Sequence, residues 1–408
     1  MPAARTPRLA VLLALPAVVA SVLAGCAPRT SGVEARREAD ERFRRTTSLV
    51  NYDQARQAFE SGDLAKARKE LDAALARSEG EARYWCLYGR VELESKRLER
   101  AIEMFDAAIA RDASLAEAYY YRGIVHQRWS DADAAIGDYL AATGHDAEKL
   151  AYPLAAAELM VAERRLGEAR ALLSSKLAYF EHNAALHELL GDVASLEGDA
   201  AGAARSYERA LVIAPDAPLL DEKVVAAYFG AGEWQRSLDA ARRMREAAMR
   251  TSGGRRADVP NDVLRHEGRS LAMLGRMAEA KSVFGEETRL YPEDVEAWRD
   301  FATACLATGD LLRAEGAAER VVALAADDFR GYMLRGFVAD RGGRHEEAVR
   351  WHRLSVARAG GELDARVALG LALRAAGRRG EGLEILAGAL RDDPASAVAR
   401  KAFADASE

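Results

Sequence analysis

The side chains that could carry out bond-making chemistry are few and widely spaced in this chain. The seven histidines include the pairs His187-Glu188 and His345-Glu346, and neither of these has the second histidine one helical turn further on that a helical zinc site requires. The sequence contains no Gly-Lys-Ser/Thr phosphate loop and no Gly-x-Ser-x-Gly nucleophile motif. We therefore expect no catalytic, cofactor-binding or metal-binding residue, and a protein that is not an enzyme.

The amino terminus contains a different kind of chemical signal. Residues 1–25 have a basic start with Arg5 and Arg8, an apolar run over residues 9–23, and a small-residue exit. This order is typical of a secretory signal peptide. The apolar run is short and contains Pro16, so a permanent membrane-spanning helix is not expected.

The signal ends in Leu23-Ala24-Gly25-Cys26, which matches the bacterial lipobox at every position. This resemblance implies that the Cys26 sulfur is lipidated and that residues 1–25 are removed. Two or three acyl chains would then anchor the protein stably. Ala27 follows where an inner-membrane retention signal would place aspartate, so the resemblance favours the periplasmic side of the outer membrane. An ordinary signal peptide with a fortuitous cysteine is the alternative.

The elements that must position any site follow from a repeat. Small residues recur at one constant interval, with a single interruption: Ala55, Gly89, Gly123, Ala157, Gly191, then Gly268, Ala302, Gly336 and Gly370. A second small series keeps a constant offset from the first: Ala67, Ala101, Ala135, Ala169, Ala203, then Ala280, Ala314, Ala348 and Gly382. We expect two helices to approach closely where these small residues face each other.

Bulky side chains and glycines recur at the same interval. We expect the bulky residues to fill the space around the close approach: Trp85, Tyr119 and Trp298 in first helices, and Phe105, Tyr139, Tyr207 and Phe284 in second helices. Glycines recur where a left-handed helix end is expected between the two helices: Gly62, Gly198, Gly232, Gly275, Gly309, Gly343 and Gly377.

This pattern resembles the tetratricopeptide repeat, a helix–turn–helix unit of about 34 residues. The resemblance implies an all-α solenoid, a right-handed superhelix of about ten repeats. We expect a tether over 26–47 with a frayed helix over 34–45, six repeats over 48–250, a loop over 251–260, four repeats over 261–396, and a cap over 397–408. Stacked repeats touch only their neighbours, which makes a disulfide between Cys86 and Cys305 implausible. We expect Cys305 to be buried and Cys86 to be the more exposed, with a mixed disulfide or a dimer left open.

In this family the first helix of each unit lines the concave groove, where protein or peptide clients bind. The implied groove residues are Tyr52, Phe59, Arg90, Tyr120, Arg265, Arg269, Arg299, Met333 and Phe337. We hypothesise that the arginine-rich segment, with Met333 and Phe337, holds an extended peptide that carries an acidic group. The alternative is a solvated charge pattern, because Asp262 and Glu296 are interspersed with these arginines.

The predicted function is a scaffold that binds protein partners and contacts the membrane only through its lipid anchor. The net charge of −6 argues against nucleic acid as a partner, because phosphate binding needs a basic surface. The resemblance is nearest to envelope-assembly lipoproteins of pilus or secretion machines. An adaptor or regulator of peptidoglycan enzymes, or of outer-membrane barrel assembly, is the alternative.

Overall fold

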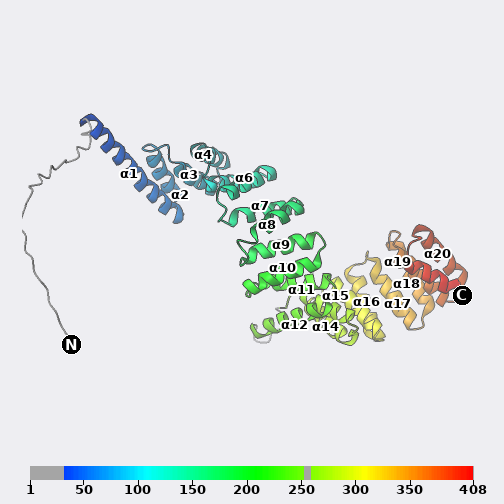
Figure 1. Ribbon diagram of the computed structural model, residues 1–408. Coiled ribbons are helices and arrows are strands. Elements are labelled where there is room, and N and C mark those ends of the chain that lie inside the picture. The colour runs from blue at the N-terminus through cyan, green and yellow to red at the C-terminus, as the bar shows by residue number, and fades with distance from the viewer. Residues whose placement is uncertain (1–31, 252–258, 408) are drawn as a thin grey trace, which may run out of the picture. The chain divides into compact units, whose positions relative to one another are not determined.

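The computed structural model describes residues 32–251 and 259–407, and all regular secondary structure in these two ranges is helical (Figure 1). The predicted signal peptide, Cys26 and most of the predicted 251–260 loop lie outside the described residues. The described helices confirm the predicted all-α fold of paired helices. Within the described ranges, no helix is both long enough and apolar enough to cross a membrane.

The chain divides into two compact units, Met1–Asp146 and Ala147–Glu408. The first unit contains three helical hairpins, formed by α1 with α2, α3 with α4, and α5 with α6. Their bounds are α1 (Gly32–Glu60), α2 (Leu64–Leu75), α3 (Ala82–Glu94), α4 (Leu98–Arg111), α5 (Ala116–Arg128) and α6 (Ala132–His145).

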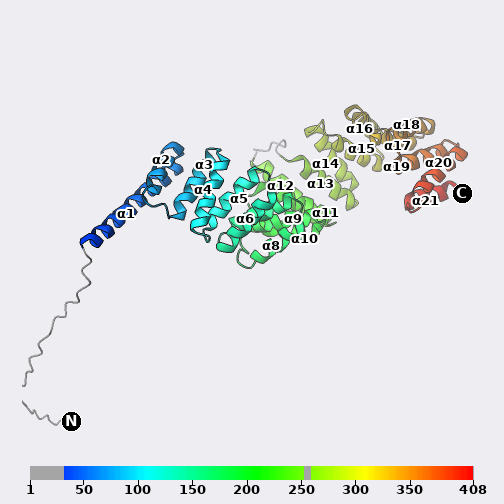
Figure 2. The same ribbon diagram turned by 90° about the horizontal axis from the view of Figure 1, so that it is seen from above.

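The second unit contains seven hairpins and a final single helix (Figure 2). The first four hairpins are α7 (Ala151–Ala162) with α8 (Leu166–Lys176), α9 (Ala184–Leu196) with α10 (Ala200–Ile213), α11 (Pro218–Gly230) with α12 (Trp234–Thr251), and α13 (Asn261–Met273) with α14 (Met277–Leu290). The others are α15 (Val295–Ala307) with α16 (Leu311–Leu324), α17 (Phe329–Arg341) with α18 (His345–Arg358), and α19 (Leu363–Ala375) with α20 (Arg379–Asp392), followed by α21 (Ala397–Ser407).

In six of the described hairpins a side chain of the second helix covers a glycine of the first helix. A Cβ placed on Gly123 would lie 2.7 Å from Cε1 of Tyr139, which no real contact allows. The same relation, at the same sequence separation, joins five other pairs: Gly89 with Phe105, Gly191 with Tyr207, Gly268 with Phe284, Gly336 with His352, and Gly370 with Leu386. The predicted close approach is therefore present, and the covering side chain sets its distance.

The inter-helix turns confirm the predicted left-handed positions. All seven predicted turn glycines have positive φ, between 73° and 82°: Gly62, Gly198, Gly232, Gly275, Gly309, Gly343 and Gly377. In the three remaining repeats Lys96, Ser130 and Arg164 take the same conformation, with φ of 60° or 61°. The left-handed turn is thus a property of the hairpin, and glycine is only its least strained residue.

The recurrent aromatic side chains of the first helices also donate hydrogen bonds to the turn between repeats. Nε1 of Trp85 donates a hydrogen bond to the carbonyl of Glu79, in the turn before its helix, at 2.8 Å. Nε1 of Trp298 donates to Pro292 in the same way at 2.9 Å. Tyr119 and Tyr332 repeat the interaction through their hydroxyl groups. These side chains therefore satisfy a loop carbonyl as well as filling space.

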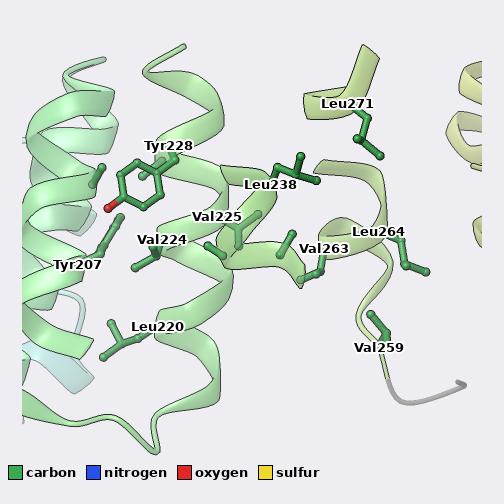
Figure 3. Packing of buried hydrophobic residues seen from close by; sticks show 14 of the residues in the cluster. Tyr207, Leu220, Val224, Val225, Tyr228, Leu238, Val259, Val263, Leu264 and Leu271 are labelled. Carbon is green, nitrogen blue, oxygen red and sulfur yellow. The ribbon is translucent and has the colours of Figure 1, made fainter. Parts of the chain in front are cut away.

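One apolar core continues across the predicted 251–260 loop, and the helix predicted within the tether is longer than expected. The predicted break over 251–260 falls inside the second unit, because one apolar core continues across it (Figure 3). Val259 and Val263 belong to the same buried cluster as Val225 and Leu238. Arg245 in α12 also pairs with Glu267 in α13 at 3.1 Å.

The predicted tether is helical from residue 32 onward. Helix α1 has 29 residues and runs without a break from Gly32 into the first repeat. Residues 32–47 need no new helix nucleus, because they extend a helix that is already held by its packing in the first repeat. An ion pair between Arg42 and Glu38, one helical turn apart at 3.1 Å, adds support along its surface.

The ring-over-glycine contact predicts opposite effects for two glycine-to-alanine substitutions. Gly89→Ala should lower the free energy of unfolding by about 2 kcal/mol, because the new methyl group displaces the Phe105 ring. Gly137→Ala in α6 is the control: nothing lies within 4 Å of its Cβ position, and alanine favours a helix by about 1 kcal/mol. Urea denaturation measures both. The packing argument is refuted if the two substitutions change the free energy of unfolding equally. It is also refuted if Phe105→Leu restores none of the stability that Gly89→Ala loses.

Candidate protein-binding face

The first helices of the first unit present a row of aromatic side chains. The ring of Tyr52 in α1 stacks on that of Tyr84 in α3, with centroids 4.8 Å apart. The guanidinium of Arg83 lies 5.6 Å from the Tyr52 ring and 5.7 Å from the Tyr84 ring. Tyr52 is half-buried, and Arg83 is exposed. This end of the row combines a rigid aromatic pair with an accessible cation.

Arg90 occupies the centre of the row. Its guanidinium lies 4.9 Å from the ring of Phe59 in α1 and 4.7 Å from the ring of Tyr121 in α5. Each such contact is worth about 0.5–1 kcal/mol where it is exposed, and more where water is excluded. Nε of Arg90 is buried and has no hydrogen-bond partner among the described residues. The predicted residues Phe59 and Arg90 are thus held together as one group.

Tyr120 lies farther along, in α5. Its ring centroid is 5.3 Å from Tyr121 and 5.6 Å from Tyr139. The structure therefore places the four predicted residues of this unit on neighbouring first helices: Tyr52, Phe59, Arg90 and Tyr120. Sequence reasoning missed Arg83 and Tyr121 as members of the row. The run Tyr119-Tyr120-Tyr121 was the available signal for Tyr121. We call these six residues, Tyr52, Phe59, Arg83, Arg90, Tyr120 and Tyr121, the aromatic row.

The predicted arginines of the second unit are bound to carboxylates of their own chain. Arg269 donates from Nε to Asp300 at 2.6 Å and also pairs with Glu296 at 3.3 Å. Arg299 pairs with Glu296 and, at 3.5 Å, with Asp328 in the next inter-repeat turn. These partners lie mainly in the following repeat, so the ion pairs join neighbouring hairpins. The pairing weighs against the hypothesis that the segment holds an acidic peptide.

Arg265 is the most buried of the three arginines, with 15% of its side chain exposed. It pairs with Asp262 at 3.1 Å, with Asp294, and with Glu287, whose Oε1 lies 3.3 Å from Nε. The Glu287 side chain is fully buried, and neither of its oxygens accepts a hydrogen bond from the described residues. Burial raises the pKa of Glu287 to about 8, and the nearby Arg265 offsets only part of this rise.

Two carboxylates on another first helix of the second unit are also paired within the chain. Nζ of Lys223 in α11 lies 2.7 Å from Glu188 and 2.8 Å from Asp192, both in α9. The Tyr207 hydroxyl donates to the same Asp192 at 2.8 Å. Lys223 therefore joins two neighbouring first helices through these carboxylates.

The remaining predicted residues of the face lie on α17. Met333 is half-buried, and Phe337 is exposed, with its ring 5.1 Å from that of His352. Burial lowers the pKa of His352 to about 4, so this histidine is neutral at physiological pH. Phe337 thus rests on an uncharged, buried ring and presents an apolar surface.

The two described cysteines are buried free thiols. Cys305 is fully buried, as predicted. Cys86 is the more exposed of the two, as predicted, but at 3% exposure it is still buried. Burial raises the pKa of Cys86 to about 12, which disfavours the thiolate that disulfide exchange requires. Among the described residues, no group of three or more His, Cys, Asp or Glu side chains could hold a metal ion.

These observations define a helical-hairpin repeat protein with an aromatic face on its first helices. Residues 52–116 and 265–329 match the family model of the tetratricopeptide repeat. These two stretches are similar to tetratricopeptide repeats, and their glycine positions under a large side chain recur in other hairpins. No curated protein matches the chain.

Several solved structures are similar in fold. The Cut9–Hcn1 hetero-tetramer of APC/C has 10% identity and a TM-score of 0.45 over 88% of this chain and 96% of that chain. A tetratricopeptide repeat protein of Parabacteroides merdae has 13% identity and a TM-score of 0.41, over 60% of this chain and 93% of that one. MamA of Desulfovibrio magneticus has 20% identity and a TM-score of 0.39, over 45% of this chain and 98% of that one.

The buried Glu287 predicts a pH dependence of stability. Its pKa is raised from 4.5 to about 8, so the folded chain holds the proton more tightly than the unfolded chain. Stability from this group is present at pH 4.5 and is lost as the pH rises towards 8. Glu287→Gln should therefore be more stable relative to the native chain at about pH 8 than at about pH 5.

Urea denaturation at the two pH values measures this difference. The control is Glu246→Gln, which removes one carboxylate from an exposed position on α12. The pKa argument is contradicted if the difference in free energy of unfolding between Glu287→Gln and the native chain is the same at both pH values. It is also contradicted if the variant gains more stability at the lower pH.

Proposed function

We propose that this protein is a non-enzymatic scaffold, anchored in the outer membrane through Cys26, that positions protein partners during the assembly of an envelope complex such as a pilus or secretion apparatus. The observation that carries the binding proposal is the placement of Arg90 between Phe59 and Tyr121, with Tyr52 and Tyr120 nearby. Arginine and aromatic residues are enriched where protein interfaces gain most of their free energy.

The rigidity of the aromatic row supports this proposal. In the free chain, Tyr52 is already stacked on Tyr84 and Arg90 on Phe59. Binding a partner therefore costs little side-chain entropy. Arg83 remains exposed and forms one ion pair, with Glu81 at 3.6 Å. A first-helix surface of this kind suits an extended or helical protein segment.

The anchoring proposal rests on the sequence Leu23-Ala24-Gly25-Cys26 and on the signal-like residues before it. Helix α1 begins at Gly32, a short distance along the chain from Cys26. From there to residue 48 the helix would extend about 24 Å, at a rise of about 1.5 Å per residue. A lipid on Cys26 would then hold the first repeat near the membrane surface.

One experiment in cells tests binding and location together. A photo-crosslinking amino acid replaces Arg83 of the aromatic row or Arg56, both of which are exposed on first helices. In control strains it replaces Lys69 or Arg100, which are exposed on second helices of the same unit. We expect one envelope protein to be captured from the first two positions but not from the controls. Arg90→Ala should reduce that capture by about tenfold or more. Cys26→Ser should move the protein from the membrane fraction to the soluble fraction.

Equal capture from first-helix and control positions would contradict the aromatic row as the binding face. A protein that stays in the membrane fraction after Cys26→Ser would contradict the lipid anchor. The identity of the captured protein separates the candidate machines: a pilin or secretin component supports the proposal, and a peptidoglycan hydrolase supports the adaptor alternative.

A further inference from the structure

A second surface with binding character lies in the second unit, where α14, α15 and α16 meet (Figure 2). A cavity of about 430 Å³ opens there, within the size range of ligand pockets in proteins. Its aromatic lining comes from Trp298 and Phe301 in α15, whose ring centroids lie 6.4 Å apart. Its other lining residues are Ala278, Lys281, Ser282, Gly285, Thr288, Arg289 and Arg313.

Gly285 is an unexpected residue in the middle of α14. Glycine disfavours a helix interior, and this one does not have the positive φ of the turn glycines. A Cβ at Gly285 would lie 3.1 Å from Cε2 of Phe301, which is tighter than an ordinary contact. In the next repeat, Glu319 occupies the equivalent position. The glycine therefore leaves the Phe301 ring uncovered at the cavity.

The charges at the cavity have one sign. Its lining contains Lys281, Arg289 and Arg313 and no carboxylate. Asp310, beside the cavity, pairs with Lys281 at 3.2 Å and with Arg313 at 3.7 Å. Arg289 is exposed and forms no ion pair with the residues that the structure describes.

This arrangement contrasts with the first-helix face of the same unit. There, Arg265, Arg269 and Arg299 are each paired with at least two carboxylates of their own chain. At the cavity, Lys281 and Arg313 share one carboxylate, and Arg289 pairs with none among the described residues. Net positive charge therefore remains around an aromatic floor, and a partner of negative charge would complement it.

A matching hollow at the earlier junction of α10, α11 and α12 provides a comparison. It has about 420 Å³ and exposed arginines at Arg205, Arg209 and Arg243. Glu208 stands at the position equivalent to Gly285, and Val224 at the position equivalent to Phe301. This hollow resembles the first in size and cations, but it lacks the aromatic floor and contains a carboxylate.

We propose that the cavity between α14, α15 and α16 binds an acidic protein segment. An apolar or aromatic side chain of the partner lies on Trp298 and Phe301, and a neighbouring carboxylate contacts Lys281, Arg289 and Arg313. This surface belongs to a different unit from the aromatic row, so the scaffold holds a second protein segment at a second place. Its test does not depend on the function proposed above.

Three short fluorescent peptides of equal length test the proposal on the purified chain without its leader. One alternates glutamate with phenylalanine and leucine, the second replaces the apolar residues by serine, and the third replaces glutamate by lysine. Fluorescence anisotropy measures binding at low and at high salt. We expect the first peptide to bind most tightly, and to bind more weakly at high salt because screening reduces the attraction between opposite charges.

Two variants locate the binding site. Gly285→Leu fills the cavity, and Arg289→Glu with Arg313→Glu reverses its charge; each should weaken binding of the first peptide at least tenfold. Arg205→Glu with Arg209→Glu is the matched control, with the same change of charge in the comparison hollow, and should leave affinity within twofold. Circular dichroism checks that each variant is folded. If Gly285→Leu is unfolded, the binding site is tested by Arg289→Glu with Arg313→Glu alone.

The proposal is overturned if the first peptide does not bind the native chain, or if the serine peptide binds equally well. It is also overturned if the two charge-reversal variants weaken binding to the same extent. Tighter binding of the lysine peptide would reverse the assigned chemistry of the partner.

Discussion

The contact between a large second-helix side chain and a glycine of the first helix is the constraint on which the rest of this structure depends. It occurs in six described hairpins at one constant sequence separation, with Phe, Tyr, His or Leu as the covering side chain. The absence of a Cβ lets the ring lie directly on the helix backbone, which fixes the separation of the two helices. Repeating that separation keeps successive first helices in register, so that one side of each unit becomes a continuous face.

The same geometry explains why the first-helix faces of the two units differ in chemistry. In the first unit neighbouring helices bring Phe59, Arg90 and Tyr121 into one stack. In the second unit they bring Arg269 to Asp300 and Arg299 to Asp328, across successive repeats. One face therefore exposes aromatic surface for a partner, whereas the other uses its charges in internal ion pairs. The cavity beside Gly285 and Phe301 differs from this face, because its lining has three cations and no carboxylate.

The hairpins could be predicted from sequence because their determinants are local and steric. A glycine, a ring in the following helix and a turn glycine fall at fixed places in the repeat period, and packing allows few alternatives. The pairing of Arg265 with Glu287 and Asp294 could not be predicted, because it depends on side-chain directions between hairpins. The helix over residues 34–45 was predicted only as frayed, because these residues lack apolar periodicity and continue a helix that is packed only later. Core continuity across 251–260 could not be predicted, because Val259 and Val263 follow an irregular insert.

Hydrogen exchange of the full chain, followed by mass spectrometry, tests the central claim that closed hairpins form one packed core within each unit. Amides of both helices in a hairpin should exchange slowly and together, because opening one helix uncovers the glycine contact of the other. Helices α11 to α14 should share this protection, although the insert separates them in sequence. Second helices that exchange as fast as an unfolded peptide while their first helices stay protected would contradict the account. Independent opening of α11–α12 and α13–α14 would contradict the shared core.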